Sequence, residues 1–139
     1  MKKSIKEGWN CSLHNESLSN GYKNSCLEAS EKDVAFNNFK RNPVYYAVVG
    51  CDSHGKPTCN IFYDWIIKNH PDFIKYFDRF RENDEIGNPI THVCGDDGIF
   101  SANTMRYAKV AGDLQKYFGS LDNNNIVEIG SGFGGQAKI

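Results

Sequence analysis

The stretch TCNIFYDWIIKNHPDFIKYFDRFREND, residues 58 to 84, carries the strongest structural signal in the chain. Its first half places Phe62, Trp65 and Ile66 at the three- and four-residue spacing of a helix face. Pro71 suits the first turn of a second helix. One face of that second helix holds Phe73, Phe77 and Phe80, with Tyr76 beside them. We predict a helical hairpin with an aromatic core, in preference to an aromatic platform for sugar stacking.

The segments upstream predict a polar arm followed by short helices. Residues 1 to 27 are rich in Asn, Ser, Lys and Glu without an apolar period, which predicts a mobile or irregular arm. Residues 28 to 100 are expected to form a helical N-terminal segment. In it, Ser30 is a candidate N-cap of a modest helix that ends at Asn42-Pro43. The run VYYAVVG, 44 to 50, fits a strand or a helix begun by Pro43, and the helical neighbourhood favours the helix.

The next segment, ENDEIGNPITHVCGDDG, residues 82 to 98, combines glycines, a proline and acidic residues, and we predict a loop. Its acids are Asp84, Glu85, Asp96 and Asp97. Their spacing lacks the alternating ligands of a calcium-binding loop. We therefore expect solvated acids and no metal site.

The composition fits a single globular domain and excludes several classes of protein. The chain has 139 residues and a net charge of −1, without a basic stripe, which disfavours a nucleic-acid binder. No apolar run is long enough to span a membrane, and the start lacks the apolar core of a signal peptide. The five cysteines form no C-x-x-C pair, which predicts reduced thiols. We expect a cytoplasmic protein of undetermined oligomeric state.

A second clear helix is predicted over FSANTMRYAKVAGDLQKYFG, residues 100 to 119, capped by Ser101 or Asn103 and ended by Gly119. Its predicted buried face holds the following residues: Met105, Ala108, Ala111, Gly112, Leu114, Gln115 and Phe118. After a polar connector, IVEI, residues 126 to 129, predicts a short buried strand. A glycine-rich turn and the start of a helix complete the chain.

This last segment, IVEIGSGFGGQAKI, residues 126 to 139, has the pattern of a nucleotide-cofactor site. Glycines after a strand let a ligand approach the main chain, and the N–H groups of the next helix attract an anion. A phosphate-binding loop needs Lys-Ser/Thr after its last glycine, where Gln136-Ala137 stands. A kinase glycine loop also fails, because its valine and its lysine strand are missing. The dinucleotide fingerprint and the first motif of S-adenosylmethionine methyltransferases both remain.

Glu128 favours the methyltransferase reading. It lies in the apolar run, and burying a carboxylate is costly unless it is paired or hydrogen-bonded. In a dinucleotide fold the negatively charged pyrophosphate lies near this position and cannot pair with an acid. S-adenosylmethionine instead carries two positive groups, an ammonium and a sulfonium. A structural acid without a ligand is the alternative. The acid that binds the ribose in either fold would follow about twenty residues later.

Three blocks in order resemble the bacterial sugar O-methyltransferase family: 79 to 89, 100 to 119 and 126 to 139. In that family the helix before the glycine motif opens Ser-Pro-Thr-Thr-Leu-Arg-Tyr, where this chain has SANTMRY at 101 to 107. The family's stretch Glu-Ile-Gly-x-Gly-Tyr-Gly-Gly-Gln matches Glu128 to Gln136, with Phe133 in the place of tyrosine. Ala102, Asn103 and Met105 depart from the family's pattern. The resemblance covers about residues 42 to 139.

The resemblance implies a class I, Rossmann-like methyltransferase that transfers a methyl group to a sugar hydroxyl in capsule or lipopolysaccharide biosynthesis. It implies S-adenosylmethionine as the cofactor and a sugar or glycan as the acceptor. The implied cofactor-binding residues are Glu128, Gly130, Ser131, Gly132, Gly134, Arg106 and Tyr107. Arg106 is a candidate for bidentate recognition of the cofactor carboxylate. No residue is assigned as the catalytic base.

The expected fold is mostly α, with residues 101 to 139 as the truncated start of the methyltransferase domain. A parallel sheet needs several strands covered on both faces, so here the strand is expected to be unpaired, paired by chance or frayed. We expect this N-terminal fragment to be inactive alone and to bind S-adenosylhomocysteine very weakly. The alternatives are the start of an NAD(P)-dependent oxidoreductase and a small helical interaction module with an incidental glycine tail.

Overall fold

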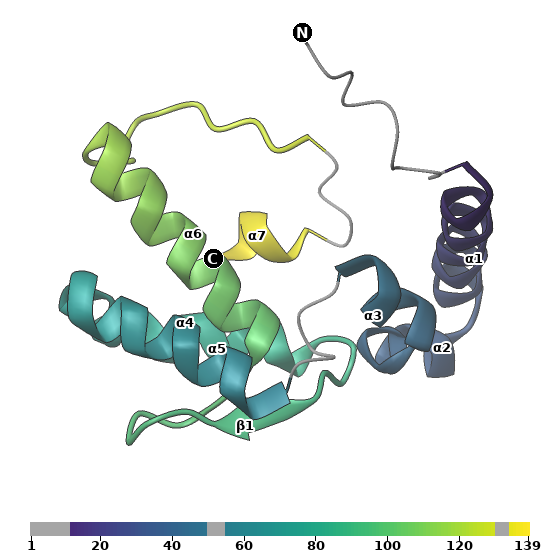
Figure 1. Ribbon diagram of the computed structural model, residues 1–139, viewed down its shortest axis with the longest axis horizontal. Helices are drawn as coiled ribbons and strands as arrows, with labels where there is room; N and C mark the ends of the chain where they lie inside the picture. Colours follow the sequence, from purple (N-terminus) through teal and green to yellow (C-terminus); the bar gives the residue numbers. More distant parts are fainter. Residues whose placement is uncertain (1–11, 50–54, 130–133) are drawn as a thin grey trace, which may run out of the picture.

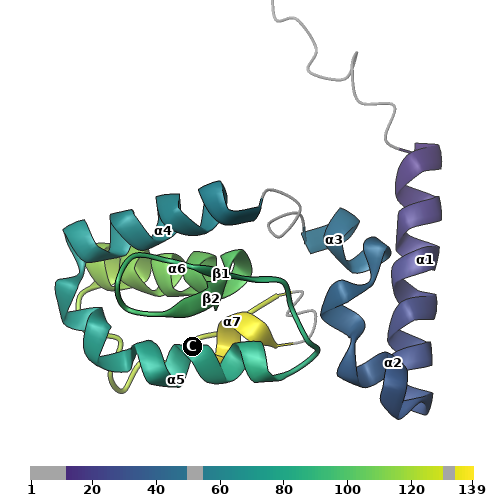
Figure 2. The same cartoon turned by 90° about the horizontal axis from the view of Figure 1, so that it is seen from below.

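The computed structural model describes residues 12–49, 55–129 and 134–139. The described chain is mostly helical, and a two-stranded antiparallel hairpin is the sheet found in it (Figures 1 and 2). This confirms the prediction of a mostly α fold. Within the described ranges, none of the helices combines the length and apolar character needed to cross a membrane.

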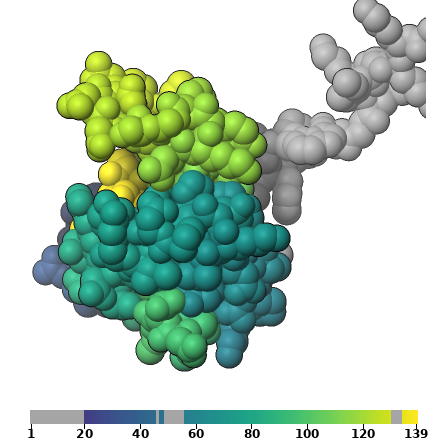
Figure 3. Space-filling view, turned by 90° about the vertical axis from the view of Figure 1, so that its left-hand side faces the viewer, coloured from purple at the N-terminus to yellow at the C-terminus, as the bar shows by residue number. Residues whose placement is uncertain are grey.

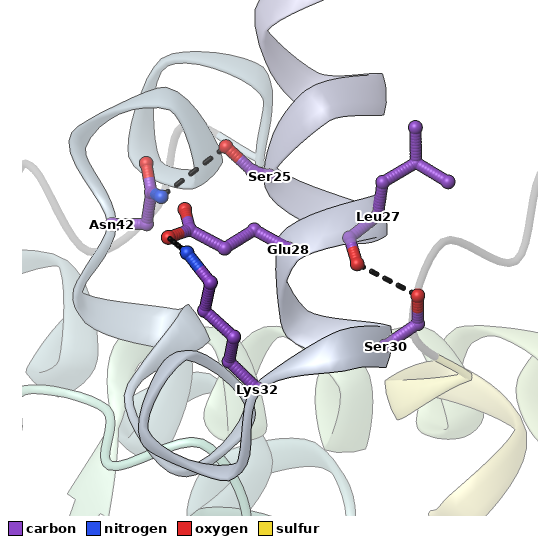
Figure 4. Close-up of polar contacts among 6 residues, drawn as sticks. All are labelled: Ser25, Leu27, Glu28, Ser30, Lys32 and Asn42. Atoms are coloured by element: carbon purple, nitrogen blue, oxygen red, sulfur yellow. Dashed lines mark hydrogen bonds and ion pairs between the residues drawn. The ribbon is translucent and has the colours of Figure 1, made fainter.

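The N-terminal helices are α1 (Ser12–Glu31), α2 (Asp33–Asn37), the 3-10 helix η1 (Phe39–Arg41) and α3 (Pro43–Val49). The prediction of an irregular arm is therefore wrong from residue 12 onwards, because α1 packs against α2 and α3. Ser30 is not an N-cap. It lies near the end of α1, where its hydroxyl donates to the Leu27 carbonyl at 2.7 Å (Figure 4). The predicted helix begun by Pro43 is confirmed.

Polar contacts join these N-terminal helices to one another and to the rest of the chain. On α1, Glu28 pairs with Lys32 at 3.1 Å, while Ser25 accepts a hydrogen bond from Asn42 at 3.2 Å (Figure 4). The segment at η1 then contacts residues 87 and 88. The Lys40 N–H donates to the Gly87 carbonyl at 3.0 Å, and Arg41 Nε donates to the Asn88 carbonyl at 2.9 Å. Backbone acceptors of a distant loop thus anchor η1.

The main body is built around α4 (Gly55–Asn69) and α6 (Ala102–Phe118), which contact each other along their lengths. Between them in sequence lie η3 (Pro71–Tyr76), α5 (Phe77–Arg81) and η4 (Glu82–Glu85). The expected second helix of the hairpin is thus divided into a 3-10, an α and a 3-10 segment. Its aromatic core is confirmed, because these residues are buried: Phe73, Phe77 and Phe80, together with Ile66 of α4 and Met105 of α6.

The residues predicted to form a loop at 82 to 98 instead contain part of a β-hairpin. Strands β1 (Thr91–Val93) and β2 (Ile99–Ser101) pair antiparallel, with His92 opposite Phe100. Phe100 points into the core and is completely buried. Its ring packs edge-on against Phe77, with centroids 5.3 Å apart. The hairpin therefore covers the core on one side, between α4 and α5 (Figure 2).

A disulfide between Cys59 and Cys94 ties the hairpin to α4. Both cysteines are fully buried and their Cα atoms are 6.5 Å apart. The prediction of reduced thiols is wrong for this pair. The two residues are far apart in sequence and do not form a C-x-x-C motif, so spacing alone did not indicate that they meet.

A buried polar network fixes the start of α6. Of the two caps that the sequence left open, Ser101 is the N-cap, and its Oγ accepts from the Thr104 N–H at 3.1 Å. The Asp84 carboxylate accepts from Ser101 N, Ser101 Oγ and Thr104 Oγ1, each at 2.7 Å. A carboxylate beside a helix N-terminus also interacts favourably with the helix dipole. The prediction that Asp84 is a solvated loop acid is therefore wrong.

Replacing Asp84 with alanine is expected to lower the free energy of unfolding by about 2 kcal/mol, because three donors lose a charged acceptor. Urea unfolding followed by circular dichroism measures this loss. Asp78→Ala is the matched control. Asp78 pairs with Arg81 at 2.6 Å, but its side chain is 95% exposed, and such surface pairs contribute little. Equal losses in the two variants would contradict the structural role of Asp84.

Tyr63 of α4 makes a partly buried contact with the turn of the hairpin. Its hydroxyl donates to Asp97 Oδ2, so Asp97 is also not the solvated acid expected from sequence. Gly95 has a φ of +56°, and a Cβ there would lie 2.3 Å from the Tyr63 hydroxyl, so this turn requires glycine. Burial, with help from the Asp97 hydrogen bond and charge, raises the pKa of Tyr63 from 10.0 to about 12.

The raised pKa of Tyr63 predicts a loss of stability at alkaline pH. Its contribution is complete below pH 10.0 and declines as the pH rises towards about 12, because the unfolded chain releases the proton first. In Tyr63→Phe this part of the decline is expected to disappear. Urea midpoints across that pH range test it. Burial and Cys26 also raise the pKa of Tyr22, so the stability of Tyr63→Phe is still expected to fall with pH, but less steeply. If the urea midpoint of Tyr63→Phe falls with pH as steeply as that of the unmodified chain, the prediction is refuted.

Candidate functional site at the glycine segment

The segment after α6 runs back along that helix without joining a sheet (Figure 1). Ile126, Val127 and Ile129 are 62%, 83% and 95% exposed. The prediction of a buried strand at 126 to 129 is therefore wrong for this chain. Of the outcomes expected for it (unpaired, paired by chance or frayed), the segment is not paired by chance, since β1 and β2 pair only with each other in the described residues. A single extended segment has no neighbour to bond its backbone.

Beyond the glycines, α7 (Gly135–Lys138) packs against α6 at Tyr107. The Gln136 side chain donates through Nε2 to the Tyr107 carbonyl at 3.1 Å. A Cβ on Gly135 would lie 2.6 Å from Tyr107 Cε2, so a larger residue would displace the ring. Gly134 precedes the helix in the left-handed region with a φ of 75°. The glycines at 134 and 135 thus allow the chain to turn and to approach α6 closely.

A cavity of about 380 Å³ separates α6 from the returning segment and α7. Its walls are mainly apolar, with Leu114 on α6, Ile126 on the returning segment and Ala137 on α7. Glu128 and Gln136 are the polar residues of the lining. The predicted cofactor acid therefore faces the same cavity as the start of the last helix.

Arg106 lies next to Tyr107 on α6, and its guanidinium carbon is 5.1 Å from the centroid of the Tyr107 ring. Both residues are half-buried. The structure thus places Tyr107 against Gly135 and Gln136, with Arg106 beside Tyr107 on α6. Glu128 and Gln136 line the same cavity. The other predicted cofactor residues, Gly130, Ser131 and Gly132, lie outside the described residues.

Of the two charged residues predicted from sequence, Glu128 lines the apolar cavity and Arg106 does not. The Glu128 carboxylate can pair with a cationic group of a ligand, and the Arg106 guanidinium can bind a carboxylate through two parallel hydrogen bonds. An α-amino acid carries both of these charges. In the part of the chain that the structure describes, no three His, Cys, Asp or Glu side chains gather as metal ligands.

Gln136 is the functional candidate that the sequence prediction omitted. It connects α7 to the main chain of α6 and also lines the cavity. The signal was present, because the family-like stretch that begins at Glu128 includes Gln136 as its last position. Its contact with Tyr107 joins the block at 100 to 119 to the block at 126 to 139, which a polar connector separates in the sequence.

Comparison with protein families, with curated proteins and with solved structures finds no match for this chain.

Proposed function

We propose that this chain is the N-terminal part of an S-adenosylmethionine-dependent sugar O-methyltransferase of bacterial polysaccharide biosynthesis. The observation that carries the proposal is the contact between two family-like blocks. Gln136, at the end of the glycine block, donates to the carbonyl of Tyr107, at the end of the Ser-x-x-Thr-x-Arg-Tyr block. Residues of the two blocks in which we see a resemblance to this family therefore lie in contact.

In this proposal the glycine segment and α6 hold the methionine end of the cofactor. Glu128 pairs with the cofactor's ammonium group, and Arg106 binds its carboxylate. Gly134 turns the chain with a φ of 75°, and Gly135 leaves room for the Tyr107 ring beside the segment that would hold the ligand. The residues that contact the ribose and adenine belong to later strands of the Rossmann-like domain.

The reaction is a displacement at the cofactor's methyl carbon. When bound, S-adenosylmethionine would supply the methyl group to a sugar hydroxyl and would leave as S-adenosylhomocysteine. The hydroxyl proton passes to a base. The described residues contribute cofactor placement to this step, which accounts for the absence of an assigned base among them.

Saturation-transfer NMR with S-adenosylhomocysteine tests the assigned roles, since it detects weak ligands. Glu128→Gln removes the charge opposite the ammonium, and Gly135→Ala pushes against the Tyr107 ring. Both are expected to reduce the transferred signal about tenfold. Asp72→Asn is the control, because this exposed acid on η3 lies outside the cavity lining. The assigned roles are wrong if S-adenosylhomocysteine gives the same saturation-transfer signal with all three variants as with the unmodified chain.

A further inference from the structure

A second cavity, which we call the aromatic cleft, lies between the helices of the main body. It has a volume of about 320 Å³ and is bordered by η3 and α5 on one side and the second half of α6 on the other. The connector at 120 to 122 closes one end. In Figure 3 the yellow-green residues of the connector region stand above the teal helices, with α7 in yellow between them.

Tyr76 gives the cleft a partly exposed aromatic wall. Phe73, Phe77 and Phe80 of the same helical segment are buried in the core, whereas Tyr76 is 41% exposed. Its ring packs on Phe73 and Phe80, with centroids 6.2 Å away from each. These neighbours hold the ring in place, so binding a ligand costs little ordering of the wall.

Three polar side chains with unused hydrogen-bonding capacity line the same cleft: Arg79, Gln115 and Asp122. Among the described residues, no hydrogen bond or ion pair engages the Arg79 guanidinium. Gln115 Oε1 is buried without a hydrogen-bond partner in the same residues, and such an atom is costly unless something satisfies it. Asp122 Oδ2 accepts from Ser120 Oγ at 2.9 Å, which fixes the carboxylate.

The aromatic cleft adjoins the cavity at the glycine segment. Ala111 and Ile139 line both cavities, so the two cavities are neighbours. Glu128 faces one cavity and Tyr76 the other. A ligand in the aromatic cleft is therefore a close neighbour of a ligand held by the glycine segment.

We propose that the aromatic cleft binds a neutral sugar ring, as the acceptor subsite next to the cofactor. An aromatic wall suits the apolar C–H face of a sugar, and planar Arg, Gln and Asp groups suit pairs of adjacent hydroxyls. Arg79 and Asp122 balance in charge, which favours a neutral ring over a phosphate. The assignment as an acceptor subsite rests on the proposed function, whereas sugar binding itself does not require the cofactor.

Saturation-transfer NMR of the full chain with the methyl glycosides of glucose, galactose and mannose tests this subsite. We expect at least one glycoside to bind at millimolar concentration. Tyr76→Ala is expected to weaken that binding about tenfold through loss of the ring. Ile74→Ala is the matched control, since Ile74 lies on the same 3-10 helix, is also 41% exposed and does not line the cleft.

Arg79→Gln provides a second variant on the exposed rim, and circular dichroism checks that each variant folds. Binding of no glycoside, equal weakening by Tyr76→Ala and Ile74→Ala, or binding of inorganic phosphate in place of sugars would each overturn the subsite. If S-adenosylhomocysteine binds and no glycoside does, the subsite is wrong and the proposed function stands. If glycosides bind and the cofactor does not, the cleft is a sugar site and the proposed function is wrong.

Discussion

Replacing both Cys59 and Cys94 with alanine is expected to lower the free energy of unfolding by about 3 to 4 kcal/mol. The disulfide closes a chain segment with a sequence separation of 35 residues, and the entropy of the unfolded chain rises when such a loop opens. The bond also holds the hairpin on α4, because Cys94 follows β1 directly. Urea unfolding under non-reducing conditions measures the effect.

The free cysteine of the N-terminal helices supplies the control. Cys26 is half-buried and forms no disulfide, so Cys26→Ala is expected to leave the urea midpoint nearly unchanged. A reductant should destabilise the unmodified chain and the Cys26 variant, but not the double alanine variant. Equal urea midpoints for the unmodified chain and the double variant without reductant would show that the two thiols are not bonded.

Replacing Phe100 with alanine is expected to cost about 3 to 5 kcal/mol, the usual range for deleting a fully buried phenylalanine. The side chain is 0% exposed. Its ring lies edge-on to Phe77 at 5.3 Å, and the Arg81 guanidinium carbon lies 4.9 Å from its centroid. The variant therefore removes the contact by which the hairpin closes the core.

Phe118 is the matched control, because it is the same residue type at 74% exposure. Phe118→Ala is expected to change stability by less than about 0.5 kcal/mol. This comparison also tests a correction to the sequence prediction, which placed Phe118 on the buried face of its helix. A larger loss for Phe118→Ala than for Phe100→Ala would mean that the end of α6 is covered and the hairpin is not.

The helical core was predictable because its signals are local. Each signal depends on residues close together in the sequence: the spacing of Phe73, Phe77 and Phe80, and the cap at Ser101. The structure shows the three rings buried and Ser101 as the N-cap. The far end of α6 was less predictable. Periodicity marks the apolar face of a helix, but it does not say where the neighbouring elements stop, so Phe118 was assigned to the core.

The hairpin was missed because its strands have three residues each and its support comes from distant parts of the chain. Tyr63 and Cys59 on α4 contact the segment through Asp97 and the disulfide to Cys94. The acids Asp84 and Asp97 looked like surface residues for the same reason. Their donors, Ser101 with Thr104 and Tyr63, are more than a dozen positions away.

The candidate site was predictable in its residue types and less so in its local structure. The glycines, Glu128 and the Arg106-Tyr107 pair were selected from sequence, and Tyr107 does lie against the residues at 135 and 136. The conformation of residues 126 to 129 was not predictable from their mainly apolar side chains. A buried parallel strand requires neighbouring strands, and the described part of the chain supplies none for it.

The central claim is that the glycine segment and α6 form the methionine end of an S-adenosylmethionine site. A titration of the nitrogen-15-labelled full chain with S-adenosylhomocysteine, followed through its backbone amide signals, tests it most directly. The account predicts weak binding that shifts the amides of Tyr107, Glu128 and residues 134 to 136, while NAD leaves them unchanged. Unshifted amides with S-adenosylhomocysteine, or equal shifts with NAD, would contradict the claim.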